Sequence, residues 1–333
     1  MRITREALLK LARNTVDLRT RLDRHLVCVY LTGSLLSNEP LLGGTTDIDL
    51  VFVHDSEPPV AREVERVSDE VHLDIAHFSQ MVFQHPRSLR LDPWLGGYLI
   101  ENPVVLYETQ HWFEFTQASV AAQFNRPETI LMRARPLSES ARQSWLSLHM
   151  GQLEPGPLWV STYLGILRDA ANTIACLSGV PLTERRFLLE FPQRAQAIER
   201  PGLAAGLVDL YYSQPATPDS WLVWQAGWKA ALTAVAGLPN CPARLKICRQ
   251  GYYERAANVL WADHPEAAIW IMLQTWTLAI NSAPELAAPE QWKNLCQALE
   301  LDEANLKNRV GALDVYLDTV EETLDVWARQ MGV

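Results

Sequence analysis

Short strand-like runs occur in about the first third of the chain, and helical spacing of apolar residues dominates from residue 127 onward. The strand-like runs lie at 26–31, 47–53, 71–78 and 104–107, and apolar and polar residues alternate in the run at 71–78. We therefore expect an α+β protein with a small mixed-sheet domain followed by an all-helical bundle, with domain bounds of 1–125 and 126–333.

Helical spacing of apolar residues predicts the elements that surround these strands. Residues 5–24 have the pattern of an amphipathic helix, and residues 60–68 are predicted as a helix with a charged face made of Arg62, Glu63, Glu65 and Arg66. Residues 33–46, rich in glycine, are predicted as a loop. In the second part, Pro and Gly separate the predicted helices 127–150, 158–178, 184–197, 202–213, 217–236, 250–260, 264–281, 288–299 and 302–330.

Three aspartates stand out as candidate metal ligands. Asp47 and Asp49 are two residues apart in one predicted strand, so their side chains share a face, with α-carbons about 6.6 Å apart. Asp74 lies on a later strand, with apolar neighbours pointing to the opposite side. Carboxylates gathered on one face suit hard divalent cations. We therefore predict that Asp47, Asp49 and Asp74 form a catalytic metal site.

A small-residue turn precedes the first acidic pair. Gly33 and Ser34 follow the predicted strand 26–31, and such a turn exposes backbone N–H groups that can hold a phosphate. Glycine is required where the backbone passes close to a ligand.

Arg168, in the helical part, has a guanidinium group that suits the geometry of a phosphate. A salt bridge within the protein is an equally open interpretation.

Each of these residues also has a plainer interpretation. Alternate acids occur on exposed strands for solubility, Asp74 fits a solvated strand position, and Ser34 fits an ordinary turn. His72 and His77 flank Asp74, and we interpret them as surface or strand-end histidines rather than as ligands or bases. The combination of turn, spacing and third acid favours catalysis over these alternatives.

The order of these residues resembles that of the nucleotidyltransferase superfamily of the DNA polymerase β type. The shared features are Gly33-Ser34, a twelve-residue gap, Asp47-Ile48-Asp49 and the lone acid Asp74. They span about residues 26–110, and the helical remainder is similar in type and position to that of aminoglycoside nucleotidyltransferases. The third acid departs from resistance enzymes of that kind, which often carry glutamate there.

This resemblance implies an enzymatic activity and its cofactors. The expected reaction transfers a nucleoside monophosphate from a nucleoside triphosphate to a hydroxyl of an acceptor and releases pyrophosphate. The expected donor is ATP, so the transferred group is AMP. Two Mg²⁺ ions would be held by the three aspartates, and Gly33, Ser34 and Arg168 would contact the nucleotide.

Net charge and composition limit the classes of partner that we expect. The formal net charge is -10 and no run of Lys or Arg occurs, which argues against a long nucleic acid and favours a small neutral or cationic acceptor. No apolar run reaches the roughly 20 residues of a membrane-spanning helix, so no membrane partner is expected.

Five widely spaced cysteines without a CxxC pair predict neither a disulfide framework nor a structural zinc site. The first residues lack the pattern of a signal peptide, and a cytoplasmic location is the expectation.

Two other functions stay open. The acceptor could be a protein or a tRNA, as in toxin and antitoxin relatives of the superfamily, or the chain could be a non-catalytic regulatory module that binds nucleotide. The helical part offers no motif that identifies the acceptor, the preferred base or the oligomeric state.

Overall fold

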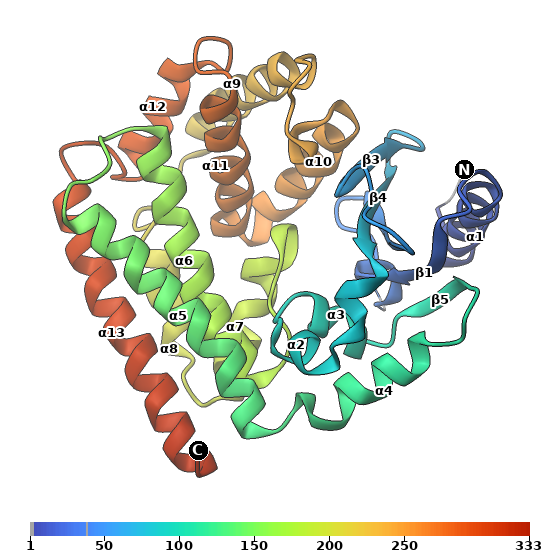
Figure 1. Cartoon of the computed structure of the whole chain (residues 1–333). Helices are drawn as coiled ribbons and strands as arrows, with labels where there is room; N and C mark the ends of the chain where they lie inside the picture. Colours follow the sequence, from blue (N-terminus) through green and yellow to red (C-terminus); the bar gives the residue numbers. More distant parts are fainter. Residues whose placement is uncertain (1–2, 38) are drawn as a thin grey trace. The chain divides into compact units, whose positions relative to one another are not determined.

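The protein, described by a computed structural model for residues 3–37 and 39–333, divides into two compact units, residues 1–129 and 130–333. The first unit contains a five-stranded mixed sheet and several helices, and the second is built from helices (Figure 1). This composition agrees with the predicted α+β class. The domain boundary between residues 125 and 126 stays a prediction.

The sheet of the first unit has the strand order β3-β4-β2-β1-β5. Its strands are β1 (Leu26–Thr32), β2 (Thr46–His54), β3 (Arg62–Arg66), β4 (Val71–Ser79) and β5 (Val104–Glu108). β2 and β4 are paired in parallel at the centre, and the other three pairings are antiparallel. The four strand-like runs are thus all confirmed as strands.

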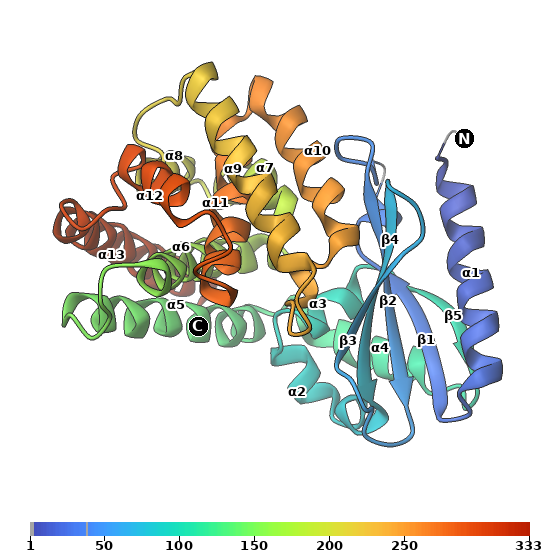
Figure 2. The same ribbon diagram turned by 90° about the horizontal axis from the view of Figure 1, so that it is seen from above.

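Helix α1 (Arg5–Leu22) packs against one face of this sheet, as Figure 2 shows. The side chain of Thr4 accepts a hydrogen bond from the backbone N–H of Ala7 and caps the helix. The shared core includes Leu8, Ala12 and Val16 from α1 and Val29, Leu31, Ile48, Leu50, Phe52, Leu73 and Ile75 from the strands. Burial of alternate strand residues under α1 leaves the intervening residues on the opposite face.

Part of that opposite face is covered by aromatic side chains from the segment that follows β4. This segment contains the short helices α2 (Pro86–Leu91) and α3 (Leu95–Ile100) and the helix α4 (Phe113–Phe124). The ring of Tyr30 on β1 lies 4.8 Å from that of Phe113, centroid to centroid, and 6.4 Å from that of Phe83. A helix over residues 113–124 was not among the predicted elements.

Residues 60–68 contain a strand, so the prediction of a helix there is wrong. In β3, Arg62, Val64 and Arg66 alternate with Glu63 and Glu65, and the strand pairs with β4 at the edge of the sheet. The two glutamates point to the side of α1, where both contact Arg19. Charged side chains are common on edge strands because they disfavour pairing with another chain. The period of these charges is therefore two rather than 3.6.

The second unit consists of long helices joined by short connections. They are α5 (Pro127–His149), which starts at the end of the first unit, α6 (Pro157–Ser178), α7 (Phe187–Ala197), α8 (Gly202–Asp209), α9 (Pro218–Ala236), α10 (Ile247–Asp263), α11 (Pro265–Ser282), α12 (Pro289–Ala298) and α13 (Leu306–Met331). Each of the nine ranges predicted as helical overlaps one of these helices.

Buried tryptophans form much of the core of this unit. The indole N–H of Trp228 donates to the hydroxyl of Thr275 at 2.9 Å, and that of Trp276 donates to the carbonyl of Ala287 at 2.9 Å. Both indoles are completely buried, so each N–H needs a partner within the protein. These hydrogen bonds fix the position of α11 relative to its neighbours.

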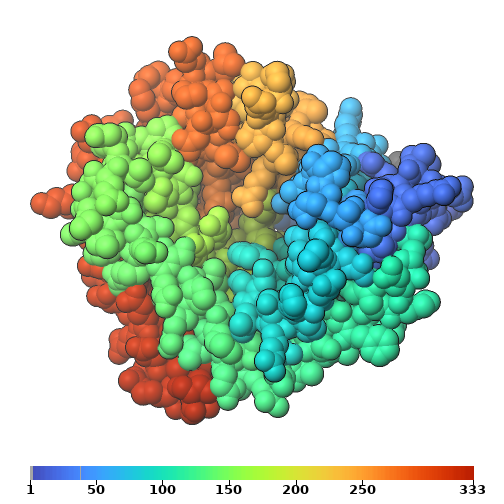
Figure 3. All heavy atoms as spheres, viewed as in Figure 1, coloured from blue at the N-terminus to red at the C-terminus, as the bar shows by residue number. Residues whose placement is uncertain are grey.

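Polar contacts also join the outer helices of this unit. The guanidinium of Arg142 on α5 pairs with Asp314, Asp318 and Glu321 of α13. The green side chains of α5 and the red ones of α13 adjoin in the space-filling view (Figure 3). Over the residues that the structure describes, no helix is both long and apolar enough to cross a membrane.

Candidate metal centre

The acidic residues lie on the sheet face opposite α1 because of the register between β2 and β4. In this parallel pairing Asp47 is the partner of His72, and Asp49 is the partner of Asp74. Paired residues share a face of the sheet, so all four side chains are on the same side. The intervening Ile48 is buried under α1. The sequence-predicted convergence of the acids on one face is therefore present.

Among the described residues, one group of side chains could hold a metal ion, namely Asp47, His72 and Asp74. One possible ligand atom from each residue lies within 4.8 Å of those of the other two. All three residues are buried, with 7% of Asp47, 1% of His72 and 4% of Asp74 exposed. A surface position for His72 and a solvated position for Asp74 are both excluded by this burial.

Asp49 is outside that group of three and lies against the Gly33 turn instead. A Cβ atom on Gly33 would be 1.9 Å from Oδ2 of Asp49, much closer than any real contact. Gly33 also has a φ of +78°, a conformation that side chains disfavour. Glycine is thus required here for two independent reasons, and the turn and Asp49 are in direct contact.

Two hydroxyl groups next to this turn have no hydrogen-bond partner among the described residues. They are Oγ1 of Thr32 and Oγ of Ser34, both shielded from solvent. Thr32 is the β1 partner of Asp49, so its side chain is on the face of the acids. A buried hydroxyl without a partner is costly and points to a ligand or an ordered water.

Arg62 is a site residue that the sequence analysis missed. Its Nε and Nη2 donate hydrogen bonds of 2.6 Å to the two carboxylate oxygens of Asp74. This bidentate pairing is the strongest interaction that an arginine makes with a carboxylate. The alternation of charges at 62–66 was the signal that could have placed Arg62 on the face of Asp74.

His77 belongs to a separate cluster on the α1 side of the sheet. Its Nδ1 lies 2.9 Å from Nε2 of His54, and its Nε2 lies 3.5 Å from the carboxylate of Glu63. Burial lowers the pKa of both histidines. His77 is therefore neither a ligand of the group around Asp74 nor an exposed strand-end residue.

Arg168, the predicted phosphate contact, lies in α6 of the second unit. Its guanidinium pairs with the neighbouring Asp169 at 3.0 Å. This contact matches the salt-bridge interpretation of its sequence, and the phosphate contact stays a prediction.

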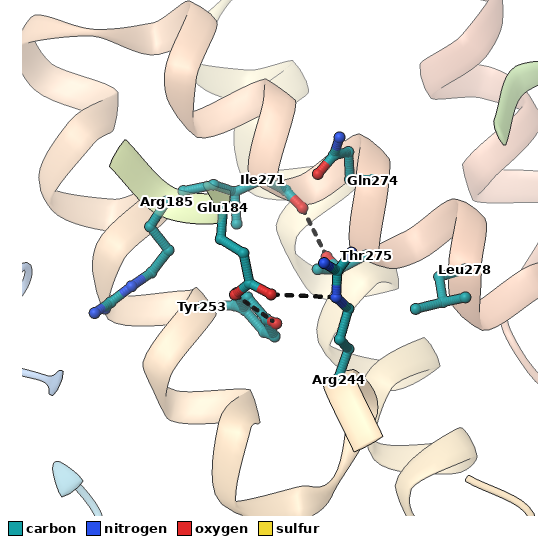
Figure 4. Close-up of a pocket in the computed structure, with 8 residues that line it drawn as sticks. All are labelled: Glu184, Arg185, Arg244, Tyr253, Ile271, Gln274, Thr275 and Leu278. Carbon is teal, nitrogen blue, oxygen red and sulfur yellow. Dashed lines mark hydrogen bonds and ion pairs between the residues drawn. The ribbon is translucent and has the colours of Figure 1, made fainter. Parts of the chain in front are cut away.

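The second unit contains a small pocket whose interior is occupied by its own ion pairs (Figure 4). Its volume is about 30 Å³, room for a water molecule, and its lining residues are Glu184, Arg185, Arg244, Tyr253, Ile271, Gln274, Thr275 and Leu278. The carboxylate of Glu184 contacts Arg244 at 3.2 Å and Arg249 at 2.7 Å. These contacts neutralise the acid, so the pocket does not suit a cationic ligand.

A wider groove of about 370 Å³ lies between α8 and α13 of the same unit. Its volume is in the range of small-molecule sites. The lining residues are Arg200, Gly202, Leu203, Gly206, Leu210, Ala312, Val315, Tyr316 and Thr319. Because they include one cation and no acid, this groove favours an apolar or anionic ligand over a cationic one.

Comparison with known proteins assigns no family to the chain. No family model matches its sequence, and no curated protein matches it either. The function is therefore inferred from the residues of the sheet face.

Proposed function

We propose that the protein is a metal-dependent nucleotidyltransferase that transfers a nucleoside monophosphate, AMP in the first instance, from a nucleoside triphosphate to a hydroxyl of a small acceptor. The observation that carries this proposal is the parallel pairing of β2 with β4. It brings Asp47 and Asp74 into one group of possible metal ligands while Asp49 contacts the Gly33 turn.

The residues present fit a divalent cation. Asp47 and Asp74 supply carboxylate oxygens from neighbouring strands, and their burial favours a cation beside them. Arg62 already contributes one positive charge at Asp74. Such ions, when bound, neutralise phosphate charge and stabilise the attacking and leaving oxygens. Asp49, half-buried beside the turn, is the third carboxylate in our proposal.

The turn supplies the groups that orient the triphosphate. Gly33 allows the backbone to approach closely, and the hydroxyls of Thr32 and Ser34 lack protein partners among the described residues. We assign these two hydroxyls to phosphate oxygens or to the waters that surround them. Their burial would exclude bulk water from one side of the reacting phosphate.

The reaction is an in-line displacement at the α-phosphorus. The acceptor oxygen forms a bond to that phosphorus while the bond to the bridging oxygen of the leaving pyrophosphate breaks. The hydroxyl proton passes to a carboxylate of the site or to water. Most of the acceleration then comes from positioning and charge neutralisation.

We propose that the acceptor is a small molecule, which can be either neutral or cationic. The net charge of -10 favours a cation, whereas neither pocket of the second unit offers an acid without a basic partner. A test panel therefore needs neutral as well as cationic hydroxyl compounds, and it needs tRNA and the protein itself as acceptors of other classes.

The test is transfer of label from α-³²P-labelled nucleoside triphosphates to this panel in the presence of Mg²⁺ or Mn²⁺. We expect one acceptor class to be labelled, and Asp47→Asn and Asp49→Asn to lower the rate by about 100-fold or more. Asp17→Asn on α1, an exposed residue, is the matched control and should be unchanged. The proposal fails if no acceptor is labelled and Asp49→Asn binds triphosphate as tightly as the parent chain does.

A further inference from the structure

His72 is placed as a metal ligand would be, although its sequence context favoured a surface histidine. It lies on β4 two residues before Asp74, so the two side chains share a face. Asp47 is its partner across the parallel pairing with β2. Only 1% of His72 is exposed, which means that its imidazole is buried next to two carboxylates.

The three residues are close enough to share a single ion. One possible ligand atom from each lies within 4.8 Å of those of the other two, whereas ligand atoms bound at about 2.1 Å and at right angles lie about 3 Å apart. Binding therefore requires the side chains to move toward the ion, and it requires Asp74 to share the oxygens that Arg62 contacts. Thr32 is 4% exposed, and its buried hydroxyl has no hydrogen-bond partner among the described residues, which favours a polar ligand on the same face.

The chemistry of this ligand set differs from that of a magnesium site. Mg²⁺ takes oxygen ligands and keeps much of its water, whereas imidazole nitrogen suits first-row transition metals such as Mn²⁺, Co²⁺ and Zn²⁺. A set of two carboxylates and one imidazole therefore favours those ions. The three-aspartate set expected from the sequence would favour Mg²⁺.

We infer that Asp47, His72 and Asp74 bind a first-row transition metal ion, with an imidazole nitrogen of His72 as a direct ligand, and that the site prefers Mn²⁺ or Co²⁺ to Mg²⁺. The role of the ion in catalysis rests on the proposed function, but its binding does not. The predicted pair of Mg²⁺ ions is thereby replaced, at this position, by a metal with affinity for nitrogen.

The first test needs no variant. The full-length protein is loaded with Mn²⁺ alone, and electron spin echo spectroscopy is used to detect coupling between the manganese electrons and a nitrogen nucleus. We expect an imidazole ¹⁴N signal from the parent chain. A spectrum without nitrogen coupling, at a stoichiometry that shows the ion is bound, overturns the inference.

The second test compares metal affinities by calorimetry. In His72→Asn we expect the nitrogen signal to disappear and Mn²⁺ affinity to fall by about 10-fold or more, since even outer partners of metal ligands have effects of that size. Mg²⁺ affinity should change much less. His85→Asn is the matched control, because His85 is exposed in the same unit. An unchanged ratio of Mn²⁺ to Mg²⁺ affinity in His72→Asn contradicts the inference.

The outcomes separate this inference from the proposed function. If the bound Mn²⁺ is coupled to nitrogen but no acceptor is labelled, the metal site is supported and the proposed transferase activity is rejected. If transfer occurs with Mg²⁺ and the Mn²⁺-loaded protein shows no nitrogen coupling, the transferase activity is supported and His72 is rejected as a ligand. If His72→Asn does not fold, as judged by near-ultraviolet circular dichroism, the spectrum of the parent chain decides alone.

Discussion

Arg62 holds Asp74 through two hydrogen bonds of 2.6 Å that use both oxygens of the carboxylate. The side chain of Asp74 is 3% exposed, whereas that of Arg62 is 43% exposed and reaches in from the edge strand. The oxygens that Arg62 occupies are also those that Asp74 would offer to a metal ion. A bound ion and Arg62 are therefore in competition for the same carboxylate.

This competition predicts opposite effects of Arg62→Met on stability and on metal binding. Loss of the arginine leaves a buried carboxylate without this partner, so we expect the free energy of unfolding to fall by about 1–3 kcal/mol. Metal affinity should rise, and added Mn²⁺ should stabilise the variant more than the parent chain. Urea denaturation with and without Mn²⁺ measures both effects.

Arg66→Met is the control for this experiment. Arg66 lies on the same strand, opposite His72, but its guanidinium forms its ion pair with the exposed Asp69. Its replacement should change stability by less than about 1 kcal/mol and leave the response to Mn²⁺ as it is. Equal responses of the two variants to Mn²⁺ would show that Arg62 and the ion do not share Asp74.

A second prediction concerns the contact between Gly33 and Asp49. Gly33→Ala introduces a Cβ at 1.9 Å from Oδ2 of Asp49 in a backbone with a φ of +78°. We expect a loss of about 2–4 kcal/mol in the free energy of unfolding and of about 100-fold or more in transfer rate, because a carboxylate of the site is displaced. Equilibrium denaturation and the labelling assay measure the two losses.

Gly44→Ala separates the backbone cost from the steric one. Gly44 has a similar φ of +74°, but a Cβ there meets no atom within 4 Å. The variant should lose only the conformational cost of about 1 kcal/mol and keep its activity. If both alanine variants behave alike, the close approach of Gly33 to Asp49 has no consequence for function.

The strands and the long helices could be predicted because their signals are local. Alternate burial of Ile48, Leu50 and Phe52 requires only one strand and one apolar face. The same local reasoning failed at Arg62–Arg66, where few apolar residues mark the period and charges were assigned to a helix face. An edge strand is less buried than a central one, so its sequence contains few apolar residues that would reveal its period.

The site could be predicted only in part, because register is not local. The positions of Asp47 and Asp74 in their strands fixed their faces, but the pairing of Asp47 with His72 depends on how two distant strands align. His72 shares the parity of Asp74, and this spacing was the available signal for a ligand. The spacing alone does not identify His72 as a ligand, because histidines near strand ends are usually exposed.

A third prediction concerns the core of the second unit. Thr275→Val removes the hydroxyl that accepts a hydrogen bond from the indole of Trp228, which then has a buried donor without that partner. We expect a loss of about 1–3 kcal/mol in the free energy of unfolding. In Trp228→Phe the same threonine change should cost less, and a double-mutant cycle by urea denaturation measures the difference. Additive effects of the two changes would contradict the coupling.

A fourth prediction is a loss of stability in mild acid that originates on the α1 side of the sheet. His54 and His77 contact each other at 2.9 Å, and burial lowers the pKa of both below the usual 6.5. The unfolded chain therefore takes up protons at these residues before the folded chain does. Their contribution is fully present above about pH 6.5 and declines as the pH falls toward the lowered values.

Burial, and not the charges around this pair, sets the direction of the effect. The carboxylates of Asp23 and Glu63 contact His54 and His77 and favour their protonation, while Arg19 opposes it at His77. His25 acts in the opposite sense, since its contact with Asp55 raises its pKa, but it is exposed and its effect is screened. The burial of the pair therefore dominates the predicted slope.

Urea denaturation between about pH 7.5 and pH 5 tests this prediction. We expect the free energy of unfolding of the parent chain to decrease over this interval, and the decrease to be smaller in His77→Phe, which removes one member of the pair. His85→Phe, an exposed change in the same unit, should keep the slope of the parent chain. A slope in His77→Phe equal to that of the parent chain would mean that the acid sensitivity has its origin elsewhere in the protein.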